Sequence, residues 1–299
     1  MSFAIVTDTS ANLPYALLRR HGVEEVPFSY LIEGTAFRCL DIEAFDGARY
    51  YDAIRKGVAV TTSQINPQRY TECFAPLLAD GQDILYVGMS SGISGSYSSA
   101  ELAVRELRER FPQSAVRLVD TYSASLGEGL LVLKAIAYRD EGLSLDATAD
   151  KLLSLRRNMC QIFTVDDLMH LRKSGRISNI AAVAGTVLSI KPLLKGDETG
   201  HIVSFGKAIG RKRAIQTLAA KYEALAVHPE EQTIGIAHAD CEQDAARLAA
   251  LLLEKRPPKD ILTVCYEPVT GAHVGPGALA LFFLGDERVR SLGEPSGRA

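Results

Sequence analysis

The chain has 299 residues, a hydrophobic fraction of 47% and a formal net charge of −3. This length is sufficient for two domains, and the slightly acidic balance argues against a general nucleic-acid binder or a protein held on anionic membranes. The five cysteines are widely spaced and form no Cys-x-x-Cys pair, so we expect reduced thiols in a cytoplasmic protein. We expect no signal peptide. The longest weakly polar run, residues 180–190, is too short for a transmembrane segment, so any membrane contact is expected to be at most transient.

The first half of the chain alternates between apolar strands and helices. We expect strands at residues 3–6, 26–32, 84–87 and 116–119, and helices that open near residues 12, 42, 66, 97 and 124. Asn12 and Asn66 are suitable N-caps for two of these helices, and Pro67 suits a first helical position. Strands that alternate with helices predict a parallel, doubly wound sheet.

Hydroxyl side chains gather where the predicted strands of this half end. The clusters lie at residues 9–10, 61–63, 90–96 and 121–125. Ligands of such sheets bind outside the carboxyl ends of the strands, so four clusters at one edge predict a polar rim. The segment 90–96, SSGISGS, has four serines, whereas a helix N-cap needs only one. We therefore interpret it as a site for an anion or carboxylate at a helix N-terminus, where the helix dipole favours negative charge.

Beyond residue 160 the pattern becomes mixed. Two short strands, 189–194 and 201–205, are predicted to form a hairpin, and Ser178 is expected to cap a helix at 179–188. The other expected elements are strands at 162–165, 233–237, 261–264 and 278–284 and helices at 167–173, 213–225 and 241–255. The predicted fold class is therefore α/β, with a parallel-sheet domain at 1–160 and an α+β domain at 161–299.

One alternative suggested by the residues is a serine hydrolase that uses Ser94 and His273. A nucleophile elbow needs Gly-x-Ser-x-Gly, and in Gly92-Ile93-Ser94-Gly95-Ser96 the second glycine is displaced by one position. Asp120 and Asp240 could each complete the triad. The six scattered histidines have no metal-binding spacing, so we expect no metal site. Neither a Walker A motif nor Gly-x-Gly-x-x-Gly is present, so we expect no nucleotide cofactor.

Three positively charged or titratable features of the second half can be interpreted in two ways each. His273 lies among three glycines and a proline, which predicts a tight loop that a ligand could approach, although a lone histidine is often structural. Arg176 is either an anion partner or a solvated charge. The basic residues at a predicted helix start oppose the helix dipole, so they indicate either a bound partner or phosphate, or a solvated face; they are Lys207, Arg211, Lys212 and Arg213.

Six ordered motifs resemble those of the DegV family: VTDTSANLP, TSQINP, SSGISGSYSSA, VDTYSASLGEGLL, DLMHLRKSGRIS followed by IKPLL, and GAHVGPGALALFF. The resemblance extends to about Gly285. It implies a two-domain fold that holds one long-chain fatty acid, such as palmitate, at the domain interface. It also implies a lipid-binding protein that is not itself an enzyme, the fatty-acid-binding subunit of a bacterial fatty acid kinase. A separate dihydroxyacetone-kinase-like, ATP-binding protein would phosphorylate the bound acid to an acyl phosphate for phospholipid synthesis.

The resemblance also implies the roles of individual residues. The carboxylate-binding threonine and serine correspond to Thr62 and Ser94, with Ser63 and Gly95 beside them. The family histidine corresponds to His273, which would contact the head group and, with the arginine at Arg176, support phosphoryl transfer.

The chain departs from the family in two places. Residues 62–67 read TSQINP where relatives often have TSQPSP, which preserves the hydroxyls. Ile209 stands where many relatives carry arginine, so Lys207, Arg211 and Arg213 are the remaining candidates for docking of the kinase. The expected tunnel walls for the acyl chain are Ile93, Ile180, Val183 and Val187.

Overall fold

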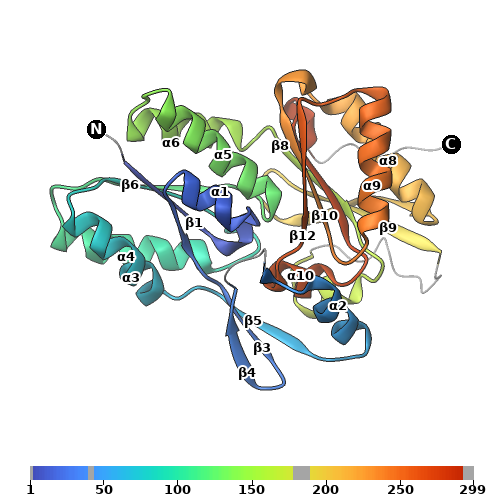
Figure 1. The fold of residues 1–299 in the computed structure, drawn as a ribbon, viewed down its shortest axis with the longest axis horizontal. Helices are drawn as coiled ribbons and strands as arrows, with labels where there is room; N and C mark the ends of the chain where they lie inside the picture. Colours follow the sequence, from blue (N-terminus) through green and yellow to red (C-terminus); the bar gives the residue numbers. More distant parts are fainter. Residues whose placement is uncertain (1–2, 40–43, 178–188, 292–299) are drawn as a thin grey trace. The chain divides into compact units, whose positions relative to one another are not determined.

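The computed structural model describes residues 3–39, 44–177 and 189–291 (Figure 1). The chain divides into two compact units. The first comprises Met1–Asp46, Val58–Arg156 and Glu267–Thr270, and the second comprises Gly47–Gly57, Arg157–Tyr266 and Gly271–Ala299. Within the described ranges, none of the helices has both the length and the apolar character needed to cross a bilayer.

The first unit contains a parallel sheet of four strands in the order β2-β1-β6-β7. Its strands are β1 (Ala4–Asp8), β2 (Val23–Val26), β6 (Ile84–Gly88) and β7 (Val116–Asp120). Figure 1 shows α3 (Pro67–Ala79) and α4 (Ser96–Arg110) on one face, and α1 (Tyr15–Arg20), α5 (Leu126–Asp140) and α6 (Leu145–Leu155) on the other. Every residue of β1 and β6 is buried because helices cover both faces. The doubly wound prediction is confirmed.

A second, three-stranded antiparallel sheet in this unit was not predicted. It consists of β4 (Thr35–Arg38), β3 (Ser29–Ile32) and β5 (Val60–Ser63), in that order. The single strand expected at 26–32 is therefore wrong, because the chain leaves the parallel sheet after Val26 and enters the new sheet at Ser29. Pro27, which has no N–H to donate to a ladder, lies at the break.

The two asparagines proposed as helix caps have different roles. Asn66 is the N-cap of α3, where its side chain accepts a hydrogen bond from the N–H of Arg69 at 3.0 Å, as predicted. Asn12 instead follows a 3₁₀ turn, η1 (Thr9–Ala11), with φ of 57°. The N-cap prediction for Asn12 is wrong because its side chain is used elsewhere: its Oδ1 accepts hydrogen bonds from Ser125 and from the N–H of Glu267.

The second unit contains a six-stranded sheet in the order β10-β9-β8-β13-β11-β12, in which only β11 and β12 run parallel. Its strands are β8 (Met159–Thr164), β9 (Ile190–Gly196), β10 (Ile202–Ile209), β11 (Thr233–His238), β12 (Asp260–Cys265) and β13 (Leu279–Leu284). The β9–β10 hairpin is confirmed, and the helix expected at 179–188 lies outside the described residues. Helices α8 (Arg211–Leu225) and α9 (Glu242–Lys255) pack on the sheet through buried residues that include Leu218 and Leu248. The remaining helices are α2 (Gly47–Arg55), α7 (Met169–Lys173) and α10 (Pro268–Val274), with 3₁₀ turns η4 (Pro229–Glu231) and η5 (Glu287–Val289).

The cap of α3 provides a test of the local fold. We expect Asn66→Ala to lower the free energy of unfolding by about 1 kcal/mol, because the N–H of Arg69 loses its side-chain acceptor. Gln68→Ala in the same turn is the matched control and should cost only a few tenths of a kcal/mol. Chemical denaturation of both variants measures the difference, and equal losses would contradict the assigned cap.

Candidate functional site

The predicted polar rim is formed by three of the four hydroxyl clusters. Residues 9–10, 90–96 and 121–125 follow β1, β6 and β7 at the carboxyl edge of the parallel sheet. The fourth cluster, 61–63, lies on β5 instead, where Thr62 pairs with Tyr30 of β3. Its placement at the end of a parallel strand was wrong, because backbone pairing with β3 draws this segment into the antiparallel sheet.

The segment between β6 and α4 places hydroxyl groups at a helix N-terminus. The N-cap residue of α4 is Gly95, which has no side chain to cap the helix. The half-buried Ser94 donates a hydrogen bond from its Oγ to Oγ of Ser96 at 2.9 Å and accepts one from the N–H of Ser96 at 3.2 Å. Because the dipole of this fifteen-residue helix favours negative charge at its start, the arrangement is suited to an anionic group.

The connection from β5 to α3 lies against the start of α4. The N–H of Ile65 donates to Oγ of Ser96 at 3.0 Å, and Nε2 of Gln64 approaches Oγ of Ser99 at 3.4 Å. A Cβ atom added to Gly95 would lie 2.2 Å from Oε1 of Gln64, so a larger residue would have to displace that amide. Two of the predicted site segments, 62–65 and 94–96, therefore adjoin within the first unit.

His273 lies in the last turn of α10, not in the tight loop that its flanking glycines predicted. The loop prediction is wrong by a few residues, since the turn comes after the helix, at Gly275 and Gly277, each with φ of 78°. A Cβ on Gly275 would lie 2.4 Å from the ring of His170, and one on Gly277 would lie 2.2 Å from Oδ2 of Asp166. In this structure the glycines are required by a left-handed backbone and by close packing.

Arg176 follows α7 in a turn, and its positive charge acts on His273. Gly175 has φ of 69°, and the N–H of Arg176 donates to the carbonyl of Leu171 at 3.0 Å, which closes the helix end. The guanidinium also donates to the carbonyl of Ser174. Burial, and then the positive charge of Arg176, lower the pKa of His273 to about 4. A neutral imidazole beside a guanidinium is therefore the state of this pair at neutral pH.

The basic residues around the start of α8 have different surroundings. Arg211 is held by Asp244, with 2.8 Å between Nε and Oδ2, and lies 3.6 Å from Oδ1 of Asp166. Lys207 and Arg213 are exposed. Ile209 is 78% exposed, so this position offers an apolar side chain to solvent where many relatives are expected to have a cation.

The hydrolase alternative gains no support from the backbone at Ser94. A nucleophile elbow holds its serine in a strained strand-to-helix turn, but Ser94 does not have a positive φ. Ser125, between β7 and α5, does have such a conformation, with φ of 52° and ψ of −141°. Ser125 is only 1% exposed and donates its hydroxyl to Oδ1 of Asn12 at 3.2 Å. An amide oxygen cannot act as the base that a nucleophilic serine needs.

Sequence reasoning missed a buried carboxyl pair, Asp8 and Glu128, at the carboxyl edge of the parallel sheet. Both are fully buried, and burial raises the pKa of Asp8 and raises that of Glu128 well above its usual range. Only the position of Asp8 directly after an apolar strand could have drawn attention to it. Glu128 is 120 residues away in the chain and its helix gives no local signal.

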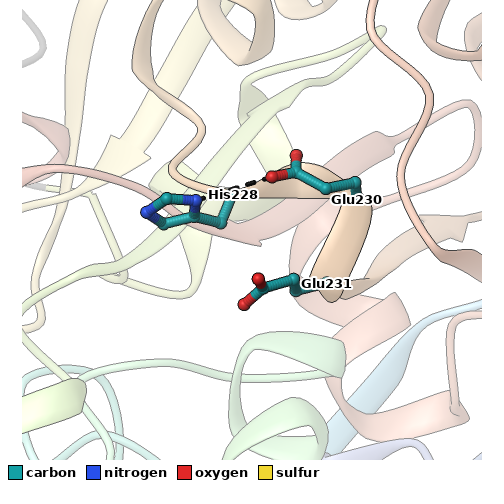
Figure 2. A group of neighbouring side chains, drawn as sticks. All are labelled: His228, Glu230 and Glu231. Atoms are coloured by element: carbon teal, nitrogen blue, oxygen red, sulfur yellow. Dashed lines mark ion pairs between the residues drawn. The ribbon is translucent and has the colours of Figure 1, made fainter.

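Among the described residues, one group of three side chains could offer ligand atoms to a metal ion (Figure 2). His228, Glu230 and Glu231 place one such atom each within 4.8 Å of the others, at η4. All three are exposed, and Nδ1 of His228 lies 3.5 Å from Oε1 of Glu230, where the two form an ion pair when the histidine is protonated. Exposed acidic groups of this kind are common without a metal, so we assign none here.

Of the residues expected to line an acyl tunnel, only Ile93 is described. It packs, partly buried, against the core cluster of the first unit that includes Met89 and Tyr86. Ile180, Val183 and Val187 lie outside the described residues.

Comparisons with known proteins agree on one family. The sequence profile described as "Uncharacterised protein, DegV family" matches residues 2–286. A DegV domain-containing protein from Clostridium perfringens is 40% identical over 287 residues, which cover 96% of this chain and 98% of that protein. A DegV family protein from Thermus thermophilus, described as binding fatty acid, has a similar structure, with a TM-score of 0.86, 31% identity and coverage of 96% and 100%. Another from Ruminococcus gnavus, solved with vaccenic acid, gives a TM-score of 0.84, 26% identity and coverage of 94% and 99%.

The lowered pKa of His273 predicts a pH dependence of stability. The unfolded chain takes up a proton on this histidine below about pH 6.5, whereas the folded chain does so only below about 4, so stability should fall as the pH drops through this interval. His273→Gln should flatten the dependence there and leave it unchanged above pH 7. Urea denaturation of both proteins at several pH values measures the effect. A dependence of equal slope in the variant would show that His273 is not buried neutral.

Proposed function

This chain belongs to the DegV family, and from that premise we propose that it binds a long-chain fatty acid, such as palmitate, and presents it to an ATP-dependent kinase. The observation that carries the proposal is the full-length similarity to the Thermus thermophilus protein, described as binding fatty acid. The hydroxyl groups at the start of α4 provide the local chemistry that a carboxylate requires.

In this proposal the carboxylate lies over the N-terminus of α4. Thr62 and Ser94 donate hydroxyl hydrogen bonds to it, and Ser63 and the backbone N–H of Gly95 are the neighbouring donors. Hydrogen bonds to an ionised group are about twice as strong as neutral ones. The carboxylate also takes the place that the helix dipole favours for negative charge.

The acyl chain supplies most of the affinity. Each buried methylene contributes about 0.8 kcal/mol, so a sixteen-carbon chain contributes roughly 10 kcal/mol before ordering costs are subtracted. The carboxylate contacts then serve mainly to orient the head group. Ile93 and the residues Ile180, Val183 and Val187 remain the proposed walls of an apolar tunnel.

The kinase partner follows from the family resemblance. We assign Arg176 and His273 to the support of phosphoryl transfer, because a guanidinium stabilises charge that develops on transferring oxygens. Lys207 and Arg213 would contact the kinase, and Arg211, held by Asp244, would set the start of α8. The chain itself would act as a cytoplasmic lipid carrier without catalytic turnover or a cofactor.

Mass spectrometry of the denatured, purified protein tests fatty-acid binding. We expect about one long-chain fatty acid released per chain, because burial of the tail makes dissociation slow. A control extraction of Asn66→Ala, which changes α3 but no proposed ligand contact, should release the same acid. Protein that carries no lipid and has no affinity for acids of about 14 to 18 carbons would contradict the proposal. Steady hydrolysis of a nitrophenyl ester that Ser94→Ala abolishes would favour the serine hydrolase instead.

The two pairs of head-group residues should differ in what they affect. Thr62→Ala and Ser94→Ala each remove one hydrogen bond to a charged group, worth roughly 1.5–3 kcal/mol, so lipid should be bound more loosely but still retained. Arg176→Ala and His273→Ala should lower acyl-phosphate formation by a cognate kinase far more than lipid affinity, because their contribution arises in the transition state. Lipid affinity and coupled kinase rate are measured on all four variants. Equal proportional losses in both quantities would show one undivided binding site.

A further inference from the structure

We propose that Asp8 is a positioning residue that fastens the carboxylate-binding segment 89–96 to the end of β1, and that it thereby sets the selectivity for a carboxylate head group. This inference rests on the proposed function and adds to it a residue that touches no ligand. It follows from the hydrogen bonds of Asp8 and of its buried neighbour Glu128.

The carboxylate of Asp8 connects two turns of the backbone. Its Oδ1 accepts a hydrogen bond from the N–H of Ser10 at 3.0 Å, in the turn after β1. Its Oδ2 accepts one from the N–H of Met89 at 3.1 Å, at the first residue after β6, and one from the hydroxyl of Tyr86 at 2.7 Å. The side chain of Glu128 is hydrogen-bonded to Asp8 as well. Burial raises the pKa of Asp8, and the hydrogen bonds from Tyr86, Met89 and Ser10 oppose this rise and favour the ionised form.

Glu128 carries a proton beside this charge. The hydroxyl oxygen of Thr7, Oγ1, lies 2.8 Å from the carbonyl oxygen of Val87 and 3.1 Å from Oε1 of Glu128. Glu128 accepts from Thr7, and it is also hydrogen-bonded to the side chain of Asp8. Two carboxyl groups that are hydrogen-bonded to each other need one proton between them, and with Asp8 ionised Glu128 carries it. The hydroxyl of Ser10 meanwhile donates to the other oxygen of Glu128. Burial, followed by the charge of Asp8, raises the pKa of Glu128 accordingly.

The network reaches the elements that hold the proposed head-group contacts. The hydroxyl oxygen of Tyr86 lies 2.9 Å from that of Tyr70. Tyr70 belongs to α3, the helix that follows segment 62–65. Met89 begins the segment that carries Ser94. One ionised side chain thus ties the end of β1, the end of β6 and, through two tyrosines, α3. Hydrogen bonds to a buried charge are stronger than neutral ones. Loss of Asp8 should therefore increase the mobility of segment 89–96 more than it weakens the pairing of the sheet strands.

The isosteric change Asp8→Asn tests the proposal. Asparagine has one acceptor oxygen, so it cannot serve both Ser10 and Met89, and one of the two turns loses its acceptor. In the ligand-free protein we expect faster amide hydrogen exchange in peptides that cover residues 9–12 or 89–94. We also expect the ratio of palmitate affinity to 1-hexadecanol affinity to fall about tenfold, because only palmitate has a carboxylate to orient.

Two matched variants separate positioning from general destabilisation. Tyr86→Phe removes the hydrogen bonds to Asp8 and to Tyr70 but leaves both backbone N–H groups their acceptor, so it should lower the thermal midpoint and lower the palmitate-to-hexadecanol ratio much less than Asp8→Asn does. Glu128→Gln should keep both the exchange rates and the affinity ratio, because an amide can donate to Asp8 as protonated Glu128 does. If Asp8→Asn does not fold, Asp8→Ser carries the same test, since serine caps the Ser10 N–H but cannot reach Met89.

The outcomes distinguish the inference from the function on which it rests. Unchanged exchange in both peptides, or a ratio that Tyr86→Phe lowers as much as Asp8→Asn, would overturn the positioning role. A wild-type protein that binds neither ligand, or binds both equally, would overturn the proposed carboxylate site. The exchange measurement would still decide whether Asp8 fastens the two turns.

Discussion

The buried charge of Asp8 is the constraint on which the edge of the parallel sheet depends. A carboxylate out of water is tolerated only where hydrogen-bond donors surround it, and here the donors come from the turn after β1, the turn after β6 and the side chain of Tyr86. Each donor is therefore held at a fixed place relative to the strands. Burial, followed by the charge of Asp8, raises the pKa of Glu128 well above its usual range, so this neighbour adds no second charge.

The two units carry different chemistry. The first unit contributes hydroxyl groups and the start of α4, which attract a negative group without carrying a formal charge. The second contributes a guanidinium, Arg176, next to a histidine that burial keeps neutral. Hydroxyl donors alone are sufficient to orient a carboxylate.

Local pattern predicted the elements well where one physical signal acted alone. The α3 start rests on an Asn-Pro pair whose cap forms within four residues, and β6 is a run of apolar residues buried on both faces. Predictions failed where two signals competed. Residues 26–32 are apolar enough for one strand, but Pro27 divides them between two sheets. The glycines beside His273 indicated a loop, yet they serve packing against His170 and Asp166 after a helix.

By itself, the sequence determined the parallel sheet, the hydroxyl-rich turns, the cap of α3 and membership of the DegV family, because each is encoded in residues close together in the chain. The tertiary structure alone decided the pairing of Asp8 with Glu128, the neutral state of His273 and the capture of Arg211 by Asp244. These depend on burial and on contacts between residues 33 or more positions apart. Dehydration of an ionisable group is a property of the surrounding fold, so no local pattern could have shown which of the charged residues would be affected.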